Sequence, residues 1–365
     1  MTAARGFASD NCSGAHPRVV EAITSVNHGH VGSYGADPET DRLDDLVRAE
    51  FGPDARIFPM LNGTGTNIAA LRAMARPHQA VICPETAHLA IDETAAPEAI
   101  AGLKLLTVPT PDGKLTPEIA HTRLADPDDI PHVAWPKVVS IAQASELGTV
   151  YTPQQVRALA DFAHSHGMLL HMDGARLANA AAALDVGLAE AGAAHGVDVL
   201  SLGANKNGTV FGEAVVFIDA PGAPDFARGL ADDFEVLRKG SLQLSSKMRF
   251  ISAQLVAVLE GGLWRELALK ANRAAAAIGE AVAWIDGVEL AQPVEANIVF
   301  IALGLEKARA FSDLCAPHRP LISPLGDVGL VRLVGSWDSQ VEDVDRVVAD
   351  LLSVLPQGRG TASSG

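Results

Sequence analysis

Hydrophobic positions in the first two thirds of the chain form short runs that alternate with segments of helical spacing. In residues 153–166, Val156, Leu159, Ala160 and Ala163 recur at intervals of three and four and share one face. The short apolar runs between such segments predict strands at 57–61, 80–83, 103–108, 138–143, 168–172, 197–202 and 214–218. This alternation predicts a mainly parallel sheet covered by helices on both faces.

From Leu242 onward the pattern changes to longer helical segments separated by short apolar runs. It predicts helices at 245–259, 264–285 and 341–355, and strands at 298–302 and 329–334. This mixture indicates a second, smaller α+β domain. The expected organisation is an N-terminal arm at 1–15, a large domain at 16–250, a small C-terminal domain at 251–356 and a disordered tail at 357–365.

Composition narrows the classes of partner. The 365 residues carry a formal net charge of −16, which argues against a nucleic-acid partner and against binding to an anionic membrane. Gly, Asp or Arg interrupts the apolar runs, so no membrane span is expected. Cys12, Cys83 and Cys315 are too widely spaced for a disulfide framework or a zinc site. We therefore expect no metal and a reducing, cytoplasmic location.

Polar segments with candidate chemistry follow several predicted strands, and parallel sheets bind ligands at the carboxyl ends of their strands. Residues 62–67, Asn-Gly-Thr-Gly-Thr-Asn, join a strand to a helix and can offer N–H groups and hydroxyls to a phosphate. The segment matches neither a dinucleotide fingerprint nor a P-loop, which argues against a nucleotide-binding enzyme. An ordinary helix cap is the alternative interpretation.

Two further strand ends supply an acid and an amine. Asp173 ends the run 168–172, with Arg176 one helical turn later, and Lys206 follows the run 197–202 in a small polar loop. Our hypothesis is that Lys206 binds a cofactor aldehyde as a Schiff base while Asp173 pairs with a protonated ring nitrogen. The alternatives are a helix-capping Asp, a surface Arg and a solvated Lys.

His88 and Arg332 complete the candidates. His88 follows the strand at 80–83 and could stack on an aromatic cofactor, with a partly exposed loop histidine as the alternative. Arg332 lies between apolar residues of a C-terminal strand, where an unpaired charge is costly. A substrate carboxylate would be a good bidentate partner for its guanidinium, and an internal salt bridge is the alternative.

Several strings together resemble the L-threonine aldolases of the β-eliminating lyase group, which are fold-type-I enzymes that use pyridoxal 5′-phosphate. The strings, within a likeness that covers residues 7–355, are Phe7-Ala8-Ser9-Asp10-Asn11, Tyr34-Gly35-Ala36-Asp37, Asn62-Gly63-Thr64, Glu85-Thr86-Ala87-His88, His171-Met172-Asp173-Gly174-Ala175-Arg176 and Asn205-Lys206-Asn207-Gly208. The resemblance implies an α/β fold whose large, cofactor-binding domain holds a mainly parallel seven-stranded sheet, with a smaller C-terminal α+β domain.

The resemblance further implies cleavage of L-threonine, L-allo-threonine or related β-hydroxy-α-amino acids, phenylserine among them, to glycine and an aldehyde. The alternatives are another lyase of the same fold type, such as a β-eliminating lyase, or serine–glycine exchange. Lys206 matches the family's Schiff-base lysine, Asp173 the partner of the pyridine nitrogen and Arg176 the residue at the phenolate oxygen. Gly63 and Thr64 match the residues that bind the cofactor phosphate.

The family's remaining site residues also have counterparts. His88 matches the histidine stacked on the cofactor ring, and His132 matches a histidine near the substrate hydroxyl. Either histidine, or a water held by them, would then be the base. Ser9 and Arg332 match groups around the substrate carboxylate.

The same resemblance implies a homodimer or homotetramer with sites at the dimer interface. Tyr34 and either Lys247 or Arg249 would reach a neighbouring subunit's site, and their spacing does not choose between the two basic residues. The sequence departs from many relatives at Gly65-Thr66, where a bulkier Gln-Ala pair is common. Asn205 precedes the lysine where Ser or Thr is common, and Gln143-Ala144-Ser145 replaces a Glu-Asn-Thr string. Together these departures resemble a subgroup that often favours bulky β-aryl substrates.

Overall fold

The computed structural model describes residues 5–129, 131–315, 321–322 and 328–355, so the expected tail at 357–365 lies outside the described residues. A seven-stranded sheet has the order β1-β7-β6-β5-β4-β2-β3. Strands β3, β2, β4, β5 and β6 are parallel, and β7 runs antiparallel to β6 and β1. The strands are β1 Arg56–Met60, β2 Ala80–Pro84, β3 Lys104–Val108, β4 Pro136–Ala142, β5 Leu169–Gly174, β6 Val199–Leu202 and β7 Glu213–Phe217. The predicted mainly parallel sheet of seven strands is confirmed.

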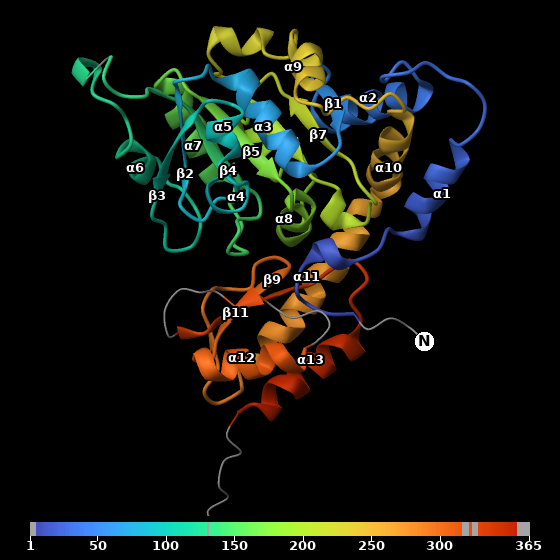
Figure 1. Cartoon of the computed structure of the whole chain (residues 1–365), viewed down its shortest axis with the longest axis vertical. Coiled ribbons are helices and arrows are strands. Elements are labelled where there is room, and N and C mark those ends of the chain that lie inside the picture. The colour runs from blue at the N-terminus through green and yellow to red at the C-terminus, as the bar shows by residue number, and fades with distance from the viewer. Residues whose placement is uncertain (1–4, 130, 316–320, 323–327, 356–365) are drawn as a thin grey trace, which may run out of the picture.

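Helices cover both faces of this sheet (Figure 1). Side chains alternate across the strands, so that Val138, Leu169 and Val215 enter one core while the residues after them enter the other. The helices up to α10 are α1 Pro17–Ser25, α2 Pro38–Phe51, α3 Gly63–Met74, α4 His88–Ile91, α5 Ala96–Ala99, α6 Pro117–His121, α7 Pro153–Ser165, α8 Leu177–Leu184, α9 Phe234–Gly240 and α10 Arg249–Leu259.

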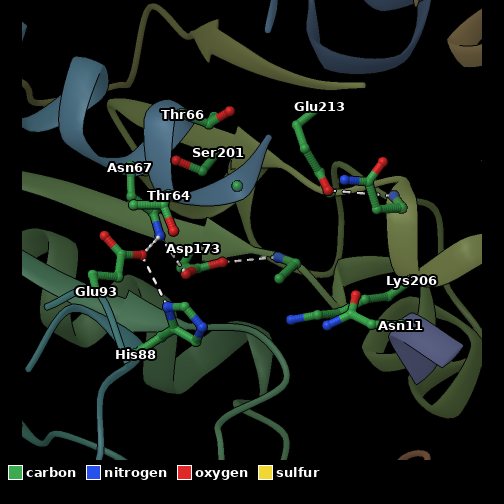
Figure 2. Close-up of a pocket in the computed structure, with 14 residues that line it drawn as sticks. Asn11, Thr64, Thr66, Asn67, His88, Glu93, Asp173, Ser201, Lys206 and Glu213 are labelled. Atoms are coloured by element: carbon green, nitrogen blue, oxygen red, sulfur yellow. Dashed lines mark hydrogen bonds and ion pairs between the residues drawn. The ribbon is translucent and has the colours of Figure 1, made fainter. Parts of the chain in front are cut away.

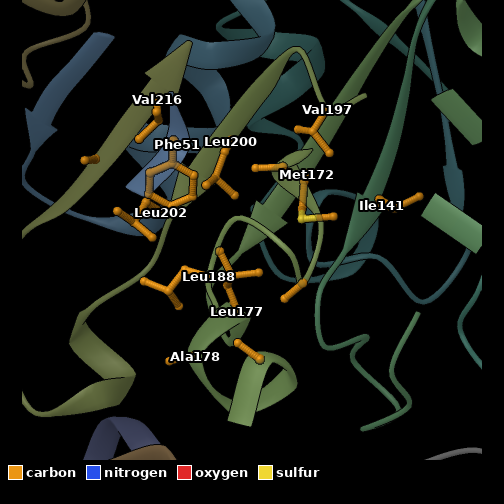
Figure 3. Packing of buried hydrophobic residues seen from close by; sticks show 14 of the residues in the cluster. Phe51, Ile141, Met172, Leu177, Ala178, Leu188, Val197, Leu200, Leu202 and Val216 are labelled. Atoms are coloured by element: carbon orange, nitrogen blue, oxygen red, sulfur yellow. The ribbon is translucent and has the colours of Figure 1, made fainter. Parts of the chain in front are cut away.

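Figure 3 shows part of the larger core, where Leu200 and Val216 of the sheet lie in one cluster with Phe51 of α2 and Leu177 of α8. All four side chains are at most 9% exposed. Burial of one such side chain contributes roughly 1.5–3 kcal/mol, so this cluster accounts for a large share of the stability of the sheet and its helices.

A second, antiparallel sheet has the order β10-β11-β9-β8 and packs with three long helices in the C-terminal part. Figure 1 shows it, with β9 and β11, on the side of the large sheet opposite α9. Its elements are β8 Glu289–Leu290, β9 Ile298–Ala302, β10 Leu321–Ile322, β11 Leu330–Val334, α11 Leu263–Val282, α12 Leu305–Leu314 and α13 Val341–Ser353. The small α+β unit expected from the sequence is therefore present.

The N-terminal arm connects the two sheets. Val334 of β11 donates its N–H to the carbonyl oxygen of Phe7 at 2.8 Å, and His16 donates its N–H to that of Gly208 at 2.8 Å. Between these anchors lies a short 3₁₀ turn, η1 Asp10–Cys12, whose Asp10 is fully buried. The arm therefore carries a buried acid into the region between the large sheet and the small sheet.

One expectation about local structure was wrong. Residues 62–67 were expected to join a strand to a helix, whereas α3 already begins at Gly63 and includes most of this segment. The side chain of Asn62 caps this helix, because its Oδ1 accepts the N–H of Gly65 at 2.8 Å. Among the residues that the structure describes, no helix is both long and apolar enough to cross a membrane.

Candidate active site

A cavity of about 170 Å³ lies at the carboxyl ends of the parallel strands. Its walls come from the first turn of α3, from segments that follow β2 and β6, from the end of β5 and from the start of β7 (Figure 2). The lining residues are Asn11, Gly63, Thr64, Thr66, Asn67, His88, Glu93, Asp173, Ala175, Ser201, Gly203, Asn205, Lys206 and Glu213. Five residues proposed from the sequence are among them.

Lys206 lies in the 3₁₀ turn η4, Asn205–Asn207, which a short link joins to the end of β6. Its ammonium has no hydrogen-bond or ion-pair partner among the residues that the structure describes. Burial, and then the positive charge of Arg176, lowers the pKa of the Lys206 amine. Both effects favour the neutral amine, which is the nucleophilic form.

Glu213, the first residue of β7, holds the backbone that presents Lys206. Its Oε2 accepts the N–H of Ala204 at 2.8 Å, and its Oε1 accepts the N–H of Asn205 at 3.3 Å. Burial raises the pKa of this carboxyl group to about 7. The sequence analysis missed Glu213, although an acid at the start of an otherwise apolar strand is a signal that could have identified it.

Asp173 lies near the carboxyl end of β5 and is 9% exposed. Its Oδ2 accepts a hydrogen bond from Nδ2 of Asn67 at 2.7 Å, and its Oδ1 accepts the N–H of Ala175 at 2.9 Å. Burial opposes ionisation, but the charge of Lys206 and these hydrogen bonds outweigh it and lower the pKa of Asp173. The cavity therefore contains a buried carboxylate that stays ionised at neutral pH.

His88 begins α4 and lines the same cavity. Its Nδ1 lies 2.9 Å from Oε1 of Glu93, and its backbone N–H donates to Oε1 of Glu146 at 2.9 Å. The hydrogen bond with Glu93 raises the pKa of the imidazole. Glu93, five residues after His88, and Glu146, 58 residues after it, were both missed, because no pattern in the sequence indicates that these acids fold back onto His88.

The first turn of α3 can bind an anion at one end of the cavity. The N–H groups of Gly63 and Thr64 have no acceptor among the described residues, and a Cβ at Gly63 would meet no atom within 4 Å. A helix N-terminus with free N–H groups favours a bound anion. At Gly65, by contrast, a Cβ would overlap the amide of Gln243, whose Oε1 accepts the N–H of Leu61 at 3.0 Å. Gln243 therefore explains why this position is glycine.

Arg176 is held by an acid from the N-terminal arm. Its Nε donates to Oδ2 of Asp10 at 2.7 Å, and its Nη2 donates to Oδ1 at 2.9 Å. Asn297, just before β9, donates from Nδ2 to Oδ2 of the same Asp10 at 3.0 Å. Asp10 thus ties the arm, the large sheet and the small sheet together. It was missed as a site residue although it stands in one of the strings that carry the resemblance.

Arg332 occupies β11 and is half-buried. Its Nε is buried and has no hydrogen-bond partner in the part of the chain that the structure describes. Burial and the charge of Arg176 lower the pKa of its guanidinium. Ser9 lies in the arm before Asp10, and its Oγ accepts the N–H of Asn11 at 3.2 Å. The internal salt bridge that was the alternative interpretation of Arg332 is not seen among the described residues.

Besides Ser9, Arg176 and Arg332, four further candidates are not among the residues that line the cavity. His132 is exposed and precedes β4, so it lies at the amino edge of the sheet, opposite the cavity. Its distance along the chain explains this difference, since His132 stands only four residues before the amino end of β4, too few for the chain to reach the opposite edge of the sheet. Tyr34 and Lys247 are exposed, and Arg249 donates from Nη1 to the carbonyl oxygen of His28 at 3.2 Å.

Known proteins resemble this chain over most of its length. A family model for beta-eliminating lyases matches residues 6–304. A low-specificity L-threonine aldolase of Pseudomonas aeruginosa is 41% identical over 350 residues, which cover 96% of this chain and 97% of that protein. A low-specificity L-threonine aldolase of Saccharomyces cerevisiae is 27% identical over 317 residues, covering 86% of this chain and 77% of that protein.

A solved structure shares the architecture described above. It is a threonine aldolase from Leishmania major, with a TM-score of 0.85 and 29% sequence identity, covering 96% of this chain and 99% of that one. The family match, the identity to the Pseudomonas aeruginosa protein and this structural similarity agree with the resemblance drawn from the sequence strings. The chain belongs to the beta-eliminating lyase family.

Proposed function

We propose that the protein cleaves L-threonine and related β-hydroxy-α-amino acids to glycine and an aldehyde, with pyridoxal 5′-phosphate as its cofactor. The observation that carries the proposal is the cavity in which Lys206, Asp173 and the first turn of α3 meet. The 41% identity to a low-specificity L-threonine aldolase over nearly the whole chain supports the same activity.

The residues of the cavity fit this cofactor. The unpaired N–H groups of Gly63 and Thr64 suit a phosphate, and the buried carboxylate of Asp173 suits a protonated pyridine nitrogen. Lys206 supplies an amine for the aldehyde, and Arg176 lies close enough for its charge to act on that amine. When bound, pyridoxal 5′-phosphate supplies an aldehyde that condenses with amines and a ring that accepts electron density from the breaking bond.

The protein's own groups then have separate tasks. Lys206 would hold the cofactor through its amine in the absence of substrate. Asp173 keeps its negative charge and so stabilises positive charge on the ring nitrogen. Arg332, whose buried Nε lacks a partner in the described part of the chain, would bind the substrate carboxylate. His88 lines the cavity and would remove the proton of the substrate β-hydroxyl, a role in which a side chain typically contributes about 10²–10⁴-fold.

A homodimer or homotetramer with sites at subunit interfaces is part of the proposal. Tyr34 is 47% exposed and Leu242 is 84% exposed, and Lys247 is exposed on the segment that follows Leu242. The family resemblance drawn from the sequence, which places sites between subunits, supports this part of the proposal, and the exposure of Tyr34 and Lys247 leaves both side chains free to reach a neighbouring subunit. We extend the proposal to a cytoplasmic location, supported by three cysteines that are all free.

The test begins with the absorbance of the purified protein mixed with pyridoxal 5′-phosphate. We expect a visible absorbance band that disappears on borohydride treatment, with the reduced cofactor mass attached to Lys206. Lys206→Ala should not be labelled, whereas Lys104→Ala, a change of an exposed residue on β3, should be labelled normally. Protein that gains no absorbance with added cofactor would refute the scheme.

Product analysis then separates the activities. A panel of β-hydroxy-α-amino acids, including L-threonine, L-allo-threonine and phenylserine, should release glycine and the matching aldehyde. Release of ammonia and a keto acid instead would identify a β-eliminating lyase. The relative rates within the panel would establish whether aliphatic or aromatic aldehydes are preferred.

A further inference from the structure

His88 is held on one side by a carboxylate that the proposed function does not yet use. The side chain of Glu93 is 0% exposed, and its Oε1 lies 2.9 Å from Nδ1 of His88. Figure 2 shows the imidazole with this nitrogen toward Glu93 and the other ring nitrogen directed away from it. The two ring nitrogens of His88 therefore have different environments.

The hydrogen bonds of Asn67 show that Glu93 is the acceptor in its contact with His88. Its Nδ2 donates to Oε1 of Glu93 at 3.0 Å and to Oδ2 of Asp173 at 2.7 Å. An amide NH₂ group can only donate, so both carboxylate oxygens accept from it. Oε1 of an ionised Glu93 can likewise only accept from the imidazole. The proton of a neutral His88 therefore resides on Nδ1, and Nε2 carries a lone pair.

We propose that Glu93 is a positioning residue that keeps the proton of His88 on Nδ1 and thereby leaves Nε2 as the base for the substrate hydroxyl. This inference rests on the proposed function. Asn67 supports it by holding Glu93 and Asp173 at fixed positions relative to each other. In the reaction step, Nε2 would take the hydroxyl proton, the Cα–Cβ bond would break and the oxygen would become the aldehyde carbonyl. The cofactor that Lys206 and Asp173 would hold supplies the acceptor for the electron pair of that bond.

The charges around His88 determine how the activity should depend on pH. Glu93 and Asp173 raise the pKa of the imidazole, whereas burial and Lys206 lower it, and the net result is an increase. Glu146 accepts the backbone N–H of His88 from the segment after β4. A base must be unprotonated, so activity should be lost as the pH falls through the pKa of His88. Loss of the Glu93 charge should move this acidic limb to lower pH.

Two substitutions separate the charge from the hydrogen bond. Glu93→Gln keeps an acceptor oxygen for Nδ1 but removes the charge, and Glu93→Ala removes both. For Glu93→Gln we expect the acidic limb of kcat/KM at lower pH, with the Nδ1–H tautomer retained. For Glu93→Ala we expect a mixture of tautomers and a kcat lower by about 10- to 100-fold, with KM nearly unchanged. Glu98→Gln, on the exposed face of α5, is the matched control.

The tautomer is measured independently of turnover by ¹⁵N NMR on histidine-labelled protein, with His88→Gln used to assign the signal. An unaltered tautomer in Glu93→Ala, or an unaltered acidic limb in Glu93→Gln, would overturn the inference. An equal loss of activity at every pH, with the tautomer preserved, would also overturn it, because that is the result of general structural damage. If the wild-type protein shows the Nδ1–H tautomer but releases no aldehyde from any β-hydroxy-α-amino acid, the proposed function fails instead.

Discussion

Glu213→Gln tests the electrostatics around Lys206 through stability rather than turnover. Glu213 is buried at the start of β7, and both of its carboxylate oxygens accept N–H groups from the backbone before Lys206. Burial raises the pKa of Glu213 from an ordinary value of 4.5 to about 7. The folded protein therefore favours the neutral acid, and ionisation of Glu213 opposes folding.

The sign and magnitude follow from that pKa. Below pH 4.5 the group is protonated in both the folded and the unfolded states. Between pH 4.5 and about 7 the unfolded chain ionises first, so the free energy of unfolding falls as the pH rises. Above pH 7 the cost is constant at about 3 kcal/mol, since each tenfold change in the ionisation equilibrium corresponds to about 1.4 kcal/mol. A glutamine does not ionise, but its NH₂ group cannot accept one of the two N–H groups, which costs about 1 kcal/mol.

Glu213→Gln should therefore stabilise the cofactor-free protein by about 2 kcal/mol at pH 8.5 and give no gain at pH 5.5. For a chain of this length, 2 kcal/mol corresponds to an increase in Tm of about 3 °C. The assay is thermal unfolding at both pH values, with Glu289→Gln on the exposed strand β8 as the control. A change in Tm that is the same at pH 5.5 and pH 8.5, or a loss only at pH 8.5, would refute this account of Glu213.

Three further substitutions test other parts of the site. Asp173→Asn should lower kcat by about 10²–10³-fold, since a charge that would stabilise the reacting ring is removed. Steady-state kinetics measures this change, and a kcat near the wild-type value would show that Asp173 does not stabilise the ring. Arg332→Ala should raise the apparent substrate KM by about 10- to 150-fold, which corresponds to the loss of one hydrogen bond to a charged group. An unchanged KM would show that Arg332 does not bind the substrate. Asp10→Asn should destabilise the protein by about 3–5 kcal/mol in urea unfolding, because Arg176 would remain buried without its counter-charge. Full stability of that variant would show that Arg176 finds another partner.

Most of the cavity could be predicted from short-range patterns. Asp173 and Lys206 each follow an apolar run, and His88 follows another. Parallel strands of one sheet direct their carboxyl ends to a common edge, so residues that follow such runs meet. The same geometry shows why His132 lies elsewhere, since it stands four residues before the amino end of β4 and not after the end of a strand. The family resemblance had placed it near the substrate, and the geometry of its own subunit does not.

Contacts between distant segments could not be predicted in this way. The pair Asp10 and Arg176 joins residues 166 positions apart, and Gln243 fills the space beside Gly65. The beginning of α3 at Gly63 was missed for a different reason, because two glycines in a first turn disfavour a helix and only the cap by Asn62 offsets them.

The sequence by itself determined the class of fold, the succession of strands and helices, and the strand ends that carry Lys206, Asp173 and His88. Hydrophobic periodicity records these features, because it reflects which face of each element is buried. Only the tertiary structure decided that Glu213 holds the lysine turn, that Glu93 contacts His88, and that Arg332 lacks a described partner at its Nε. Hydrogen bonds and burial depend on the positions of groups brought together by folding, and local periodicity contains no record of those positions.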